Sequence, residues 1–137
     1  MDWKECSFKK LSKEIRPDGN LTASLLKSSA KKISSQKLLP LNEDTASSKV
    51  TLAYDALGEV LEALSVLKGY KIYNHECYVP FLAEIINEHS FADRFDKFRR
   101  VRNSINYYGK EISPGEAGEI IKGILELLDQ IRKKFFA

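Results

Sequence analysis

The stretch from residue 91 to residue 109 places the strongest constraint on how this chain folds. Its sequence is FADRFDKFRRVRNSINYYG, and its apolar residues recur at steps of three and four. This spacing predicts an α-helix that buries one face in a core. With about 100° between successive residues, however, Arg102 falls inside the apolar face, between Phe98 and Ile105, and Asn106 falls at its edge.

Arg102 allows two interpretations. A buried and unpaired guanidinium is costly, so the side chain must find a partner. In the first interpretation it buries its stem and pairs with a carboxylate or with carbonyls at a helix end. In the second it lines a groove or a subunit interface and binds phosphate through two parallel hydrogen bonds.

The neighbours of Arg102 favour a nucleic-acid ligand, although a solvated charged helix face is the alternative. Residues 93 to 102 hold five basic groups against two carboxylates, and Tyr107 and Tyr108 follow them. Proteins that recognise single-stranded nucleic acid use basic groups for phosphate and aromatic rings for bases. The residues that we expect to contact nucleic acid are Arg99, Arg100, Arg102, Asn106 and Tyr108.

Composition indicates an ordinary globular protein. The chain has 137 residues, of which 43% are hydrophobic and 30% charged, and this length suits one domain. The net charge of +3 is too small to establish a nucleic-acid partner. The basic charge is concentrated in residues 1 to 40, which hold nine Lys or Arg against four Asp or Glu. No apolar run approaches the length of a membrane span, so we expect no membrane partner.

The cysteines and histidines do not predict a metal site or a cofactor. Cys6 and Cys77 lack metal-ligand spacing and a disulfide framework, and the N-terminus lacks the apolar region of a signal peptide. We therefore expect reduced thiols in a cytoplasmic protein. His75 and His89 lie far apart in the sequence, which favours a structural role for each. The chain also lacks a Gly-rich phosphate loop and the other common catalytic motifs.

Four core helices are predicted from hydrophobic periodicity and from capping residues. Their ranges are 42–68, 75–88, 90–108 and 114–136. Asn42, Ser90 and Ser113 are the expected N-terminal caps, and Gly109 is expected to end the third helix. Pro80 predicts an irregular start to the second helix. No stretch alternates with period two, so the fold class is all-α, an up-and-down helical bundle.

The helix over 42–68 has the broadest apolar stripe and is predicted to lie at the centre of the core. Its carboxylates fall opposite that stripe and are expected to face solvent. They are Asp55, Glu59 and Glu62.

Two regions are expected along the chain. Residues 42–137 form the helical bundle, and residues 1–41 form a basic, Ser- and Lys-rich helical extension. Within the extension, residues 21–39 have a weak apolar stripe and many serines, which are poor residues for a helix interior. We expect that helix to depend on packing against the rest of the chain.

Residues 42 to 136 resemble a HEPN domain (higher eukaryotes and prokaryotes nucleotide-binding). The resemblance is carried by the segments AYDALGEVLEALSVLKGYKI, HECYVPFLAEI and FRRVRNSINYYGKEIS, followed by an amphipathic last helix. It implies a helical bundle that forms a homodimer, in which the arginine motifs of two protomers meet in one cleft. It also implies binding of RNA or a nucleotide, cleavage of RNA without a metal in many members, and a nucleotidyltransferase antitoxin as partner of prokaryotic members.

The chain departs from the family motif at one position. In the motif a polar residue directly follows an arginine, and four to six residues in all separate that arginine from a histidine. Arg102-Asn103 matches the first part of the motif. Tyr107 stands where the histidine is expected, and a tyrosine with a pKa of about 10 is a poor general base at neutral pH. Any catalysis would use Arg102, Asn103 and Tyr107, and we expect binding to be retained with ribonuclease activity weakened, lost or differently organised.

The missing histidine also supports a hypothesis from a different class. The chain would then be a non-catalytic helical module for dimerisation or for adaptor contacts, with Arg102 as a structural interface charge. Binding of nucleic acid weakens steeply as salt rises, whereas association of apolar helix faces does not. Salt dependence therefore separates the two hypotheses. An active ribonuclease is the third alternative.

Overall fold

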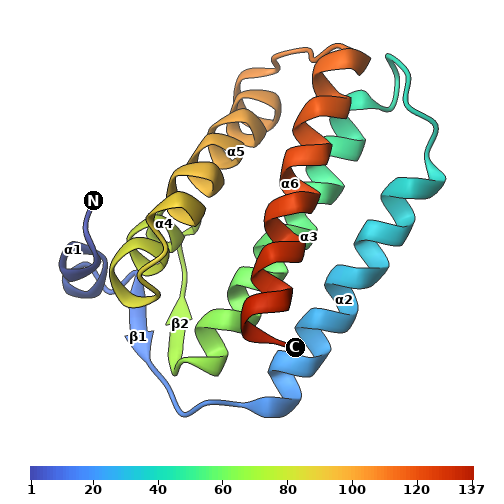
Figure 1. Ribbon diagram of the computed structural model, residues 1–137. Coiled ribbons are helices and arrows are strands. Elements are labelled where there is room, and N and C mark those ends of the chain that lie inside the picture. The colour runs from blue at the N-terminus through green and yellow to red at the C-terminus, as the bar shows by residue number, and fades with distance from the viewer.

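The structure is a computed structural model that describes residues 1–137, and it is built almost wholly of helices (Figure 1). Four long helices alternate in direction, and one two-stranded sheet accompanies them. The long helices are α2 (Gly19–Leu38), α3 (Ala46–Leu67), α5 (His89–Tyr108) and α6 (Pro114–Phe135). The predicted all-α class is confirmed. None of these helices is both long and apolar enough to cross a membrane.

The α3 helix lies at the centre of the core, as predicted. It packs along α2 on one side and along α6 on another, and it also contacts α5. Leu57, Leu61 and Leu64 are fully buried, and burial of such side chains stabilises the fold by about 1.5 to 3 kcal/mol each. On the side of α2, the hydroxyl of buried Ser29 donates a hydrogen bond to the carbonyl of Ala56. A serine that is unfavourable for an isolated helix is thus satisfied by packing.

The start of α3 differs from the prediction. The helix begins at Ala46 rather than at residue 42. Asn42 accepts hydrogen bonds from the backbone N–H groups of Asp44 and Thr45, and this closes a turn ahead of the helix. Asparagine side chains favour both N-caps and such turns, and the sequence alone does not separate the two outcomes.

The segment predicted as a helix over 75–88 is three short pieces. They are η1 (His75–Cys77), α4 (Tyr78–Pro80) and the π-helical η2 (Phe81–Ile85). The irregularity expected from Pro80 is confirmed, and Asn74 caps η1 by accepting a hydrogen bond from the N–H of Glu76. The predicted cap at Ser90 is wrong, because α5 begins at His89 and no side chain caps it.

The ends of α5 and α6 follow the sequence signals. Gly109 ends α5 in the left-handed region, with φ of 63°, a conformation that glycine adopts without steric cost. Ser113 accepts a hydrogen bond from the N–H of Glu116, and Pro114 occupies the first turn of α6. Both predicted boundaries are confirmed.

The N-terminal segment contains a short helix, as expected of a helical extension, and a strand that the sequence did not predict. Helix α1 (Trp3–Phe8) is followed by β1 (Ser12–Glu14), which pairs antiparallel with β2 (Tyr70–Ile72). Ser12 lies opposite Ile72 in this pairing. Strands of three residues are too short to show an alternating pattern.

A disulfide joins the two cysteines, so the expectation of reduced thiols is wrong. Cys6 in α1 and Cys77 in η1 are fully buried, and their Cα atoms lie 6.0 Å apart. Sequence spacing gave no sign of this pair, because it is the docking of α1 beside the short elements before α5 that brings the cysteines together (Figure 1).

Reduction of the Cys6–Cys77 bond is expected to destabilise the protein. The bond spans 71 residues, and a cross-link over such a loop constrains the unfolded chain enough to contribute about 2 to 4 kcal/mol. Denaturant unfolding with and without reductant measures the difference. A variant with both cysteines changed to alanine should not respond to reductant, and two reactive thiols in unfolded but unreduced protein would contradict the bond.

Candidate functional site

Arg102 is packed against an aromatic ring and lies near one carboxylate. The central carbon of its guanidinium is 5.1 Å from the centroid of the Tyr54 ring, which is the distance of a cation–π contact. Its Nη2 is 3.7 Å from Oδ1 of Asp55, and its Nε is buried without a hydrogen-bond partner. A separation of 3.7 Å is too long for a hydrogen bond. The guanidinium therefore keeps unused capacity to donate.

The end of Arg102 lines an open polar pocket, which we call the Arg102 pocket. Its volume is about 240 Å³, which suits one small chemical group rather than a drug-sized molecule. Residues from α2, α3, η1 and α5 line it. They are Lys32, Asp55, Gly58, Glu59, Glu62, His75 and Arg102. The three carboxylates expected to face solvent are thus gathered on one wall of a pocket.

The carboxylates of the pocket are partly engaged by cations. Glu59 forms an ion pair with Lys32 and accepts a hydrogen bond from Ser28. Glu62 lies 3.6 Å from the ammonium of Lys71. The only ion-pair partner of Asp55 is the guanidinium of Arg102, at 3.7 Å. No group of three metal-ligating side chains is arranged to hold a metal ion.

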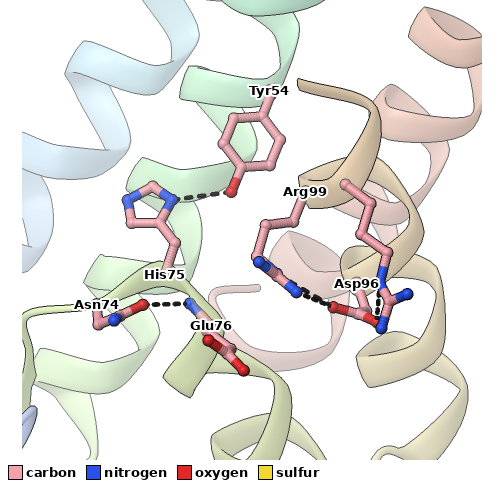
Figure 2. A network of polar contacts seen from close by, with 7 residues as sticks. Tyr54, Asn74, His75, Glu76, Asp96 and Arg99 are labelled. Atoms are coloured by element: carbon pink, nitrogen blue, oxygen red, sulfur yellow. Dashed lines mark hydrogen bonds and ion pairs between the residues drawn. The ribbon is translucent and has the colours of Figure 1, made fainter. Parts of the chain in front are cut away.

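His75 is the functional candidate that the sequence did not reveal. Its Nδ1 is hydrogen-bonded to the hydroxyl of Tyr54 at 2.8 Å (Figure 2). Burial raises the pKa of Tyr54 well above its ordinary value, so this hydroxyl stays protonated. Partial burial, and then the charge of Arg102, lower the pKa of His75 below 6.5. The imidazole is therefore neutral at pH 7 and lies in the same pocket as an arginine.

Gly58 allows the imidazole to lie close to α3. A Cβ atom built at this buried glycine would lie 3.3 Å from Cε1 of His75, which is tighter than an ordinary van der Waals contact. The position of His75 therefore depends on a helix residue without a side chain.

The arginines that the sequence places together, Arg99, Arg100 and Arg102, lie in different environments in the structure. Arg99 donates two hydrogen bonds to Oδ1 of Asp96 (Figure 2). Arg100 donates one to Oδ2 of the same carboxylate. The side chain of Arg99 is only 16% exposed, whereas that of Arg100 is 74% exposed. Arg100 lines a separate pocket together with Lys110. The structure therefore does not bring Arg100 and Arg102 to one site.

The remaining predicted residues lie near the C-terminal end of α5. Asn103 is half-buried and Asn106 is exposed. The side chains of Tyr107 and Tyr108 are 69% and 82% exposed, and neither lines the Arg102 pocket. Both rings are exposed and lie outside the pocket.

Comparison of the chain with protein-family models, with curated proteins and with solved structures finds no match.

The pKa of His75 should respond in opposite directions to two neighbouring substitutions. Arg102 lowers this pKa and Asp55 raises it, so Arg102→Met is expected to raise the value and Asp55→Asn to lower it. A ¹H–¹³C NMR titration of the imidazole measures both shifts, and His75→Gln assigns the resonance. Shifts of the same sign in the two variants would contradict the charge arrangement of the pocket.

Proposed function

We propose that the protein binds RNA or a nucleotide at the Arg102 pocket. The observation that carries this proposal is the state of Arg102: its stem is packed, its guanidinium faces an open pocket, and no protein group fills its hydrogen bonds. A planar guanidinium held in this way is suited to a ligand that presents hydrogen-bond acceptors to it. The resemblance to HEPN proteins supports the same ligand class.

Exposed side chains near the end of α5 would extend such an interface. Tyr107 and Tyr108 offer rings on which unpaired bases can stack. The exposed side chains of Arg100 and Lys110 supply charge for phosphates at the separate pocket that they line, away from Arg102. These groups suit single-stranded RNA better than a duplex, whose bases are already stacked. A HEPN-like homodimer and a nucleotidyltransferase partner, which the resemblance implies, stay predictions.

Replacing Arg102 should weaken RNA binding without unfolding the protein. Arg102→Met keeps a stem against Tyr54 and removes the donors, so we expect a loss of about 10- to 100-fold in affinity, the effect of losing hydrogen bonds from a charged group. Fluorescence anisotropy with a short single-stranded RNA at fixed salt measures it. Arg94→Met is the matched control, because Arg94 lies on the same helix but bonds to Gln130 outside the pocket.

Equal affinity of the folded Arg102→Met variant and the wild type would remove the proposal. Binding should also weaken as salt rises. If the protein forms dimers that resist salt and binds no RNA, the non-catalytic dimerisation or adaptor module becomes the better explanation of the same surface.

Cleavage of RNA is a second candidate function, and the presence of His75 in the Arg102 pocket favours it. A histidine that is neutral at pH 7 can accept a proton. In such a reaction His75, which is exposed at the mouth of the pocket, would take the proton of a ribose 2′-hydroxyl. The 2′-oxygen would attack the adjacent phosphorus to form a 2′,3′-cyclic phosphate, and the bond to the 5′-oxygen would break as that oxygen takes a proton from water. Tyr107 is then not needed as a base.

The cleavage hypothesis makes a separate prediction. His75→Gln should abolish cleavage while leaving RNA affinity within a few-fold of wild type, because glutamine cannot serve as a base. A substrate with 2′-deoxyribose at the cleaved position should resist the wild-type protein. Cleavage that survives both His75→Gln and Arg102→Met would identify a contaminating nuclease instead.

A further inference from the structure

The charges around Arg102 are unfavourable for a phosphate group inside the pocket. The pocket is lined by three carboxylates, two cations and one imidazole that is neutral at pH 7. A phosphate would approach carboxylates at close range, and like charges in a partly desolvated site repel. The pocket is better suited to a neutral group that presents donors and acceptors on one edge.

The spacing of Arg102 and Asp55 defines which edge fits. Nη2 of Arg102 and Oδ1 of Asp55 lie side by side at 3.7 Å, too far apart to satisfy each other but close enough to contact neighbouring atoms of one ligand. The guanidinium needs an acceptor, and the carboxylate needs a donor next to it. Nucleobases present acceptor and donor atoms in this adjacent arrangement.

Guanine can form more hydrogen bonds with Arg102 and Asp55 together than the other bases can. It is the one common base with two adjacent N–H donors on its edge, N1–H and N2–H, next to the carbonyl oxygen O6. An ionised carboxylate accepts two parallel N–H donors, and arginine is the usual donor to O6. His75 is the one aromatic residue that lines the pocket, and its partly exposed ring can contact the face of a base.

We propose that the Arg102 pocket binds an unpaired guanine base, with Arg102 donating to O6 and Asp55 accepting from N1–H and N2–H. This assignment rests on the proposed binding of RNA or a nucleotide and names the part of that ligand which enters the pocket. Phosphates of the same strand then lie outside the pocket.

The test compares single-stranded RNAs that differ at one position. Uridine tracts carry one central guanosine, inosine, adenosine or uridine, and the full chain is titrated with each at the same salt. Guanosine is expected to bind about 5- to 100-fold more tightly than adenosine, the discrimination that a two-contact base pairing supplies. Inosine lacks the N2 donor and should fall between them.

Two variants place the preference in the pocket. Asp55→Asn should remove the preference for guanosine, because an amide does not accept two donors in parallel, while retaining the binding that depends on exposed charge. Asp129→Asn is the matched control, since Asp129 is an exposed carboxylate on α6 that pairs with Lys133. A preference that persists in Asp55→Asn would overturn the assignment.

A direct measurement avoids dependence on the folding of any variant. Guanosine, which carries no phosphate, should shift the imidazole resonances of His75 in the wild-type protein and compete with RNA, and inorganic phosphate should do neither. Competition by phosphate alone would overturn the guanine assignment. RNA binding that is equal for all four central bases would overturn it and leave the proposed function in place, whereas absence of binding to every RNA would remove both.

Discussion

The packing of Tyr54 is the interaction on which the candidate site depends. This residue belongs to α3, is fully buried, and stacks on Phe95 of α5 with ring centroids 5.8 Å apart. The same side chain presents its ring to Arg102 and its hydroxyl to His75. One core residue therefore fixes two polar groups of the pocket, Arg102 and His75. A change in the packing of α3 against α5 would move the pocket with it.

Arg102 stabilises the fold no more than an apolar side chain of similar size would. Its cation–π contact with Tyr54 is worth about 0.5 to 2 kcal/mol, and its pair with Asp55 is partly exposed and too long for a hydrogen bond. Bringing a charge out of water opposes both contributions. A ligand that supplies acceptors to the guanidinium would gain binding energy from hydrogen bonds that the fold leaves unmade. A charged residue on the apolar face of a core helix, with little benefit to stability, therefore points to function.

Sequence reasoning predicted what depends on local pattern. The long helices followed from apolar spacing, and the caps at Ser113 and Gly109 followed from turn chemistry. It failed where tertiary contacts decide the outcome, as for strands β1 and β2 and for the disulfide. The unusual placement of Arg102 was visible in the sequence. The approach of His75 was not, because this residue comes from a short irregular element whose position depends on packing.

The N-terminal 41 residues contribute to the site although the family resemblance begins after them. Lys32 of α2 lines the pocket and pairs with Glu59, which reduces the negative charge on that wall. Cys6 of α1 is bonded to Cys77, two residues after His75. The segment that carries His75 is thereby tied to the N-terminus of the chain. The pocket is a property of the whole chain, since neither its charge nor the anchoring of its histidine is set by residues 42–137 alone.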